Sequence, residues 1–529
     1  MTKLKKQSFL KGALILAIAN VVVKAIGALY KIPLTNLLGP DGIGIYNAGY
    51  TIYNMLFAIA TAGLPIAISK MVSENIAENN YAEARQTFIV SRRLLFAVGV
   101  AGALLLFFGA GFFAKRINME ASAMSVAALA PCMFFVAIMS SYRGLFQGMS
   151  NMEPTAYSEV IEASCKLLLG LLLAYILMPN GKPFAAAGAI LGVSTGAFLA
   201  ALFLMGYYLR VKGELKEKAE KSDAKCMSSS RTLKKLLSLA IPITIGSAVF
   251  SIASVIDLAM IANQLAGLGF DEHTRTTMYG YYSGHAVTLF NMPLTILSSL
   301  GISVIPALSS ALRQKNKLSA KTTIETAIRI TLLFALPCAV GLSVLSGPIL
   351  SFLFSGDANA AGMLSVLSYG IIFVSIVTVS NSILQADGKV WVPVINMLIG
   401  GAVKVIVNFV LVGNIDININ GAPYGTVFCY VTTATLNLIV IYKSFRPNYG
   451  WMFVIKAVMS AAIMGALAYF TCSLVKPLAG NLIGMASGIA VGAVSYLMFL
   501  IVLRTLKHDD VEAMPGSKYI LKMIGRFIR

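Results

Sequence analysis

Long apolar runs dominate this chain. Fourteen of them follow one another along the 529 residues, and each approaches or exceeds the roughly 20 residues that a helix needs to cross a bilayer. Only 12% of the residues are charged, whereas soluble domains carry about 25%. Helices satisfy their own backbone hydrogen bonds inside lipid, and the alternating pattern of barrel strands is absent. The sequence therefore predicts an all-α polytopic membrane protein.

The charges predict how the chain is oriented in the membrane. The predicted spans cover residues 9–32, 43–68, 89–113, 121–146, 155–178, 184–208, 236–261, 279–308, 326–346, 360–385, 391–413, 421–442, 452–475 and 480–503. Lys and Arg concentrate in the connections on the side of both termini, so the positive-inside rule places both termini in the cytoplasm. The same rule accounts for the net charge of +20, and we expect no nucleic-acid partner.

Landmarks separated by a constant 238 residues indicate an internal duplication. The offset links Gly63 to Gly301, Phe135-Val136 to Phe373-Val374, Gln147 to Gln385, and Lys166 to Lys404. A charged linker, residues 210–235, falls where one copy ends and the next begins. We predict an N-lobe at 1–230, a C-lobe at 231–446, and a segment at 447–529 with two further helices. Substrates of such repeats commonly bind at the repeat interface.

Charged side chains within the apolar spans are the main candidates for function. A lysine at the bilayer centre costs about 2.5–3.5 kcal/mol on insertion scales. One lobe offers Lys24 together with Glu162 and Lys166, and the other offers Asp257 together with Lys404 and Asn408. Glu162 and Lys166 are four residues apart, as are Lys404 and Asn408, so each pair shares a helix face. The pattern fits either internal salt bridges that lock each lobe or a cavity that binds an anionic substrate.

The cavity interpretation adds three more basic residues and a coupling hypothesis. Lys31, Arg143 and His285 join Lys24, Lys166 and Lys404 as candidate substrate contacts, since a diphosphate needs several cations. His285 either titrates near neutral pH or serves only in packing. Asp257, Glu162 and Asn408 are candidate coupling or charge-pairing groups. No P-loop or HExxH motif is visible, so we expect no enzyme, metal or cofactor. Na⁺, H⁺ or the membrane potential would then supply the energy.

Helix ends and the C-terminal tail add smaller predictions. Proline and glycine in the second and eighth spans fit helices that bend during transport. The tail repeats cations on one helical face opposite apolar residues, so we expect it to lie on anionic phospholipids. Its cations are Lys518, Lys522, Arg526 and Arg529.

Three stretches carry a family resemblance. The first is 141–148, SYRGLFQG, followed by NMEPTA at 151–156 and VIE at 160–162. The others are GPDGIGIY at 39–46 and GLPIAISK at 63–70. Together they resemble the stage V sporulation protein B/YtgP group. That group belongs to the MOP superfamily, together with MATE exporters, Wzx oligosaccharide flippases and MurJ-type lipid II flippases.

The resemblance implies a MOP/MATE-like fold of fourteen helices, two six-helix lobes plus two extra helices that form a lipid-facing groove. It also implies a bacterial plasma-membrane flippase for a polyprenyl-diphosphate-linked saccharide, most simply a lipid II-type peptidoglycan precursor. MurJ-type proteins place basic residues in helices 1, 2 and 8, where Lys24 fits helix 1 and helix 8 offers only His285. Some relatives bind a cation between helices 7, 11 and 12. Here either Asp257 and Asn408 would serve that site, or the ammonium of Lys404 would replace the ion.

Other functions remain open from the sequence. The alternatives are a flippase for another polyprenyl-linked polysaccharide unit, a MATE-like cation-coupled exporter, and a membrane polymerase or ligase. Excess lysine over acid in the predicted cavity disfavours the exporter, and short outer connections disfavour the enzyme. We expect the protein to act as a monomer.

Overall fold

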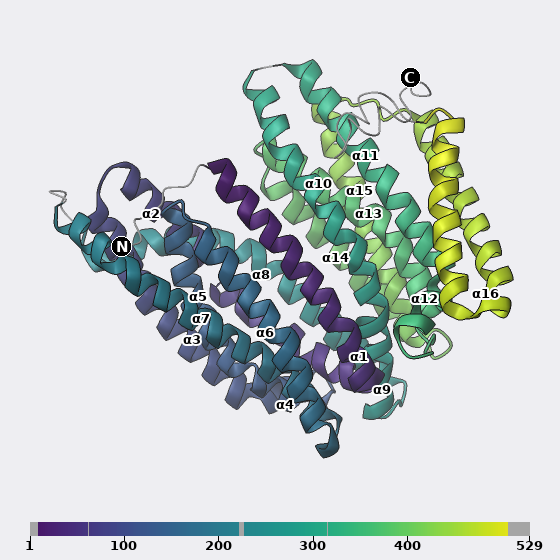
Figure 1. Ribbon diagram of the computed structural model, residues 1–529, viewed down its shortest axis with the longest axis horizontal. Helices are drawn as coiled ribbons and strands as arrows, with labels where there is room; N and C mark the ends of the chain where they lie inside the picture. The colour runs from purple at the N-terminus through teal and green to yellow at the C-terminus, as the bar shows by residue number, and fades with distance from the viewer. Residues whose placement is uncertain (1–8, 62, 222–226, 315, 506–529) are drawn as a thin grey trace. The chain divides into compact units, whose positions relative to one another are not determined.

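The computed structural model describes residues 9–61, 63–221, 227–314 and 316–505, and within these ranges every regular element is helical (Figure 1). The chain divides into two compact units, residues 1–280 and 281–529. Residues 1–8 lie outside the described residues. So does the basic tail from residue 506 onward, which is predicted to lie on the membrane surface.

The described part of the first unit contains nine α-helices and two short 3₁₀ turns. Helix α6 packs along α7, α3 along α5, and α1 against α6, α8 and α9. The elements are α1 (Phe9–Thr61), α2 (Leu64–Ala77), α3 (Tyr81–Arg116), η1 (Glu120–Ser122), α4 (Ala123–Ala128), α5 (Ala130–Gly148), α6 (Glu153–Leu177), η2 (Met178–Asn180), α7 (Lys182–Glu220), α8 (Ser229–Gly267) and α9 (Glu272–Gly280).

The second unit begins with a π-helical turn, and its described residues continue through seven α-helices and one 3₁₀ turn. Helix α13 packs against α10, α11 and α15, while α14 pairs with α15 and α16 packs against α11. The elements are η3 (Tyr281–Ala286), α10 (Val287–Arg313), α11 (Lys317–Val344), α12 (Ser346–Leu353), α13 (Ala361–Ala386), α14 (Trp391–Val412), η4 (Asn418–Gly421), α15 (Ala422–Phe445) and α16 (Trp451–Val502).

Two of the longest helices are interrupted at a glycine. Gly39 in α1 has φ 70° and ψ 177°, and Gly480 in α16 has φ 85° and ψ 169°. Glycine adopts this left-handed region without the steric cost that a Cβ atom brings. Each break lets the chain reverse between two spans that the sequence predicts separately.

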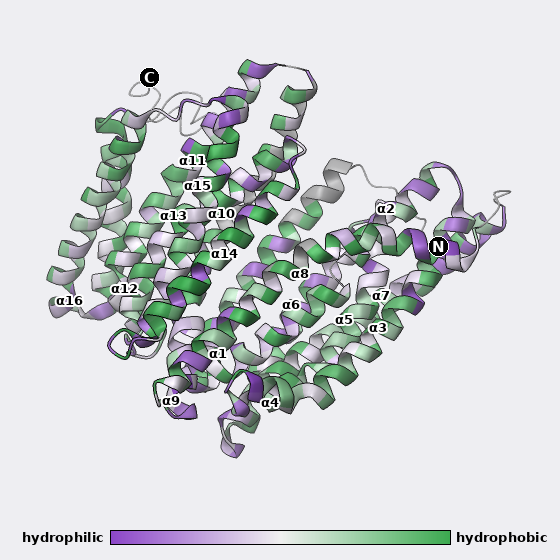
Figure 2. Ribbon diagram, turned by 180° about the vertical axis from the view of Figure 1, so that it is seen from behind, coloured by the Kyte–Doolittle hydropathy of each residue, from purple (hydrophilic) through white to green (hydrophobic). Residues whose placement is uncertain are grey.

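The hydropathy of the helices supports a multi-pass membrane protein. Among the described residues, ten helices are long and apolar enough to cross a membrane. The described residues of all fourteen predicted spans fall mainly on helical segments, and the α1 and α16 helices each contain two of them or parts of them. Figure 2 shows hydrophilic residues interrupting otherwise hydrophobic helices such as α6 and α8. The all-α prediction is therefore confirmed.

The compact units do not follow the predicted lobe boundary at residue 230. Helix α8, which the prediction assigns to the C-lobe, packs against α1, α2 and α3. The backbone of α2 is tied to α8 where Gly63 N donates to the Thr244 hydroxyl at 3.2 Å. Because of these contacts, α8 belongs to the first compact unit, which ends at Gly280. The division into duplicated lobes concerns sequence repetition and stays a prediction.

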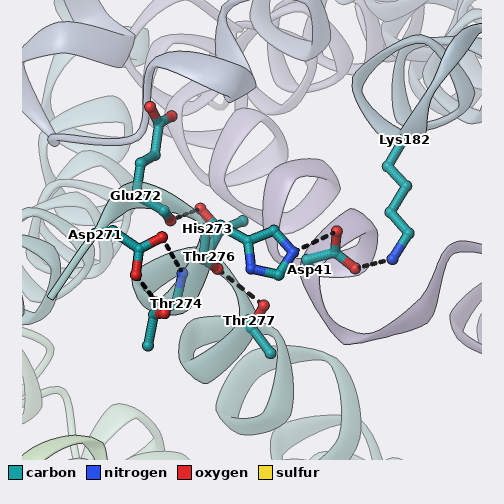
Figure 3. A network of polar contacts seen from close by, with 8 residues as sticks. All are labelled: Asp41, Lys182, Asp271, Glu272, His273, Thr274, Thr276 and Thr277. Atoms are coloured by element: carbon teal, nitrogen blue, oxygen red, sulfur yellow. Dashed lines mark hydrogen bonds and ion pairs between the residues drawn. The ribbon is translucent and has the colours of Figure 1, made fainter.

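Polar contacts fasten α9 to the start of the second half of α1 (Figure 3). The Asp41 carboxylate receives Lys182 Nζ, from the first residue of α7, at 2.5 Å, and His273 Nε2 lies 3.6 Å from its other oxygen. At the start of α9, Asp271 accepts hydrogen bonds from the Thr274 hydroxyl and backbone N at 2.5 and 3.3 Å. The hydroxyl contact lowers the pKa of the Asp271 carboxyl.

Glycines allow α9 to approach the α1 backbone closely. A Cβ atom on Gly44 would lie 2.2 Å from the Thr276 carbonyl oxygen, and one on Gly280 would lie 1.6 Å from the Pro40 carbonyl oxygen. No ordinary side chain fits at either position. This end of the unit, the predicted outer end, is therefore a closely packed junction of α1, α7 and α9.

Candidate functional site

Two lysines and three tyrosines gather in the membrane-spanning part of the first unit. We call this group, Tyr30, Lys31, Tyr46, Tyr50 and Lys166, the lysine–tyrosine cluster. Lys31 Nζ lies 4.9 Å from the Tyr46 ring centre, and Lys166 Nζ lies 5.1 and 5.0 Å from those of Tyr30 and Tyr50. The rings adjoin one another, with centroid distances of 6.5 Å for Tyr30–Tyr46 and 5.7 Å for Tyr46–Tyr50.

The cluster holds two ammonium groups against aromatic rings. An ammonium group over an aromatic face is attracted by the ring quadrupole, by about 0.5–2 kcal/mol depending on its desolvation. Lys31 also donates to Asn47 Oδ1 at 2.5 Å. Both lysines are half-buried, so each keeps part of its surface accessible. The arrangement can orient two ammonium groups and present them to an anion.

Small residues in α6 and α7 bring the cluster together. A Cβ atom on Gly192 would lie 2.2 Å from the Gly170 Cα atom, so α6 and α7 touch backbone to backbone there. The Tyr30 ring packs over Gly170 and its hydroxyl donates to the Ala189 carbonyl at 3.4 Å. Lys166 stands one helical turn before Gly170, which places its ammonium beside Tyr30.

The predicted contact Arg143 forms an ion pair with another candidate residue. Its Nη2 atom donates to Glu162 Oε2 at 2.9 Å, and its Nε atom donates to the Ser158 hydroxyl at 3.0 Å. The Arg143 and Glu162 side chains are only 18% and 28% exposed. Their spacing on one helix face groups Glu162 with Lys166, but the ion pair of Glu162 is with Arg143 on α5. The arginine, serine and glutamate of the motif therefore join α5 to α6.

The other two candidates of the first unit lie on α1 and α8. Lys24 is exposed on α1, two turns before Lys31 and on the same helix face. Asp257 is half-buried on α8. The lysine–tyrosine cluster contains neither residue, so their predicted roles stay predictions.

The candidates of the second unit lie on α14 and in the π-helical turn. Asn408 is fully buried, and its Oδ1 atom occupies the space that a Cβ atom on Gly425 would need. Lys404, one turn earlier on α14, is half-buried. His285 is 3% exposed and packs with its ring centre 4.3 Å from that of Phe354. Single-turn π segments frequently occur at functional sites.

An apolar cavity of about 520 Å³ opens in the second unit between α10, α11, α12 and α16. Its wall combines small residues with bulky aliphatic ones, among them Met292, Cys338, Gly341, Ile349, Met464 and Gly492. Small residues leave room and the aliphatic residues keep it free of polar groups. The cavity therefore suits a hydrocarbon chain.

Sequence reasoning identified both lysines of the cluster. It missed the three tyrosines of the cluster and Asn47, the hydrogen-bond partner of Lys31. The signal was present in the spacing of Tyr46, Tyr50 and Tyr53, which recurs every three or four residues, as on one side of a helix. Aromatic residues at that spacing are also common in ordinary packing, so spacing alone does not reveal the lysines above them.

Comparison with known families identifies the chain. The sequence profile of the family described as "Polysaccharide biosynthesis protein" matches residues 9–312, more than half of its length. The chain belongs to this family. A second profile, MatE, matches residues 283–410. Both matches agree with membership of the MOP superfamily, the resemblance seen in the motif at 141–162.

Individual relatives match over nearly the full length. Stage V sporulation protein B of Bacillus subtilis (strain 168) is 27% identical over 533 residues and covers 99% of each chain. Lipid II flippase MurJ of the same organism is 23% identical over 496 residues and covers 90% of each. A solved structure of lipid II flippase MurJ in an inward closed conformation superposes with a TM-score of 0.68 at 14% identity. It covers 93% of this chain and 98% of that one, which shows the MOP fold.

Proposed function

We propose that this protein is a flippase that carries a polyprenyl-diphosphate-linked saccharide from the inner to the outer leaflet of a bacterial plasma membrane. The lysine–tyrosine cluster is the observation that carries the proposal. A lipid II-type peptidoglycan precursor is the first candidate substrate, and alternating access is the proposed mechanism. Both termini would lie in the cytoplasm.

The cluster suits the part of such a substrate that cannot cross lipid unaided. A diphosphate and its sugars lose their hydrogen bonds to water in hydrocarbon, which costs several kcal/mol for each unpaired group. Lys31 and Lys166 offer two ammonium groups, which lie over the neighbouring rings of Tyr46 and Tyr50. Lysine acts on phosphate as a point charge, so two of them match two phosphates.

Features outside the cluster support the same function. The apolar cavity of the second unit would suit the isoprenoid chain. The relatives named above include a lipid II flippase, and the family profile is that of polysaccharide biosynthesis. The description of the family, polysaccharide biosynthesis, equally supports another polyprenyl-linked saccharide as the substrate. The two lysines of the cluster disfavour an exporter of organic cations.

The membrane potential would drive the cycle. Moving one elementary charge through 100 mV is worth about 2.3 kcal/mol. An inside-negative potential therefore favours outward movement of an anionic head group. Asp257, Glu162 and Asn408 remain our proposed groups for coupling or charge pairing. Lys24, Arg143, His285 and Lys404 remain our proposed further contacts to the head group.

Flipping of a fluorescent lipid II in proteoliposomes tests the proposal. The wild-type protein, Lys166→Gln and Lys212→Gln would be reconstituted, and transfer between leaflets would be timed with and without an inside-negative potential. Lys212 is exposed near the end of α7, so its replacement makes the same charge change away from the cluster.

The expected result is flipping that the potential accelerates, that Lys166→Gln abolishes and that Lys212→Gln leaves intact. A folded wild-type protein that flips neither lipid II nor other polyprenyl-diphosphate saccharides would contradict the proposal. Uptake of an organic cation in the same vesicles would favour the exporter instead.

A further inference from the structure

One face of the second half of α1 combines amide and aromatic side chains. We call Asn47, Tyr50, Asn54 and Phe57 the asparagine–aromatic face. Their spacing of three, four and three residues places them on one side of the helix. Asn54 is exposed and the other three are half-buried. Tyr46 and Tyr53 flank these residues on the helix and are buried, as is Ile52 on another side, so that all three are at most 5% exposed.

This composition is unsuited to lipid. The face lies within the apolar helical range Ile18–Ala77. An amide in hydrocarbon loses its hydrogen bonds to water, which is costly. Polar side chains within membrane spans generally face a water-filled region or a ligand. Asn54, exposed in the middle of the span, therefore indicates a hydrated surface.

The face continues directly from the lysine–tyrosine cluster. Lys31 Nζ donates to Asn47 Oδ1 at 2.5 Å, and Lys166 Nζ lies 5.0 Å from the Tyr50 ring centre. From there the aromatic contacts continue through Tyr53 to Phe57, with centroid distances of 5.7 and 5.9 Å. A ligand whose phosphates bind the two lysines would thus place its next chemical group against this face.

We propose that the asparagine–aromatic face binds the saccharide of the transported lipid, beginning with the sugar attached to the diphosphate. A sugar ring has an apolar C–H surface that packs on the negative face of an aromatic ring. Its hydroxyl and amide groups pair with asparagine, which both donates and accepts hydrogen bonds. The face extends about 15 Å along the helix axis, room for more than one sugar ring. This inference rests on the proposed function and adds the part of the substrate that is recognised.

Binding of three lipids to the full-length protein in nanodiscs tests the inference. The probes are undecaprenyl diphosphate without sugar, with one hexosamine, and with a disaccharide. Wild-type protein is expected to bind the sugar-bearing lipids more tightly than the bare diphosphate. Asn54→Ala and Phe57→Leu are each expected to weaken binding of the sugar-bearing lipids about tenfold and to leave the bare diphosphate unchanged.

Tyr53→Phe is the matched control, since it keeps the ring between Tyr50 and Phe57 and removes only a buried hydroxyl, to which Cys132 donates. It is expected to change binding of none of the three lipids. Thermal unfolding midpoints would show that all variants fold.

Two results would overturn the inference. Equal weakening of all three lipids in Asn54→Ala would assign the face to the diphosphate or the tail, and unchanged binding in both variants would remove it from recognition. Either outcome leaves the proposed function standing. A wild-type protein that binds none of the lipids would overturn the proposed function and the inference together.

Discussion

Single residues in this protein show how a charge inside a membrane span is made tolerable. Arg143 is matched by a carboxylate and a hydroxyl on the neighbouring helix, so its hydrogen bonds serve the packing of α5 on α6. Lys166 is matched instead by two aromatic faces. A ring neutralises no charge, so an ammonium held this way remains able to attract an anion. The Lys166 ammonium therefore keeps more of its charge for a bound anion than the Arg143 guanidinium does.

Replacing Arg143 with methionine should destabilise the fold. Glu162 would keep its charge while only 28% exposed, and losing hydrogen bonds to a charged partner costs about 1.5–3 kcal/mol. The double variant Arg143→Met/Glu162→Gln should recover a large part of the loss. Thermal unfolding midpoints of the single and double variants in detergent would measure this coupling.

The control is Lys70→Met, which breaks the exposed contact between Lys70 and Glu74 at 3.9 Å. Exposed ion pairs contribute about 0–1 kcal/mol, so its midpoint should barely move. Equal midpoints for Arg143→Met and Lys70→Met would show that the α5–α6 pair is not structural.

Prediction from the sequence succeeded or failed at single residues for physical reasons. A charge in an apolar run is conspicuous, so Lys31 and Lys166 could be found. The partner of Glu162 could not be predicted, because Lys166, four positions away on the same helix, is only one of several neighbours of Glu162. Arg143 reaches it from α5, and that approach depends on how two helices pack.

Among the elements, α1 and α9 depend on glycine at defined positions. Helix α1 reverses at Gly39, and α9 then packs against its second half at distances that exclude side chains. The sequence predicted both spans of α1 from hydropathy alone. It gave no sign that α9 would pack there, because an approach of two backbones leaves no periodic pattern in either segment.

Gly44→Ala should loosen the junction of α1 and α9. Its Cβ atom would lie 2.2 Å from the Thr276 carbonyl oxygen, so one helix must shift, at a cost of about 1–3 kcal/mol. We expect a lower unfolding midpoint and faster proteolysis between residues 267 and 280. Gly27→Ala is the control on the same helix, because its Cβ atom would meet nothing within 4 Å.

Alanine is favoured over glycine in a helix by about 0.5–1 kcal/mol, so Gly27→Ala should be neutral or slightly stabilising. Unchanged proteolysis and an unchanged midpoint in Gly44→Ala would contradict the close packing of α9.

At the scale of the molecule, each of the two compact units contributes a different chemistry. The first carries the lysine–tyrosine cluster and the asparagine–aromatic face, and the second carries the apolar cavity. Composition and charge predicted a polytopic membrane protein. They did not predict that the two compact units would meet at Gly280 and not at the charged linker. Contacts of α8 with α1 and α2 decide that boundary, and composition does not reveal them.

Filling the apolar cavity should weaken binding of the isoprenoid chain. A Cβ atom on Gly341 would have only Met464 Cε within 4.0 Å, so Gly341→Phe should enter the cavity without striking the backbone. The phenyl ring would exclude one five-carbon isoprene unit from the cavity. At a binding free energy of about 0.3 kcal/mol per carbon atom, this loss would weaken binding of an uncharged polyprenol roughly tenfold. Equilibrium binding in nanodiscs would measure it.

Gly362→Phe is the matched control, since Gly362 is exposed at the start of α13 and does not line the cavity. Equal polyprenol affinity in Gly341→Phe and Gly362→Phe would show that the chain binds elsewhere.

Photo-crosslinking at Asn54 tests most directly whether the polar head of a polyprenyl-diphosphate saccharide lies against the first unit. A benzophenone side chain would replace Asn54 in one variant and Phe108, which is 78% exposed on α3, in another. The Asn54 variant should crosslink the radiolabelled lipid, and unlabelled lipid should compete. At Phe108 crosslinking should be weak and unaffected by competitor. Equal crosslinking at both positions, unaffected by competitor, would contradict the account.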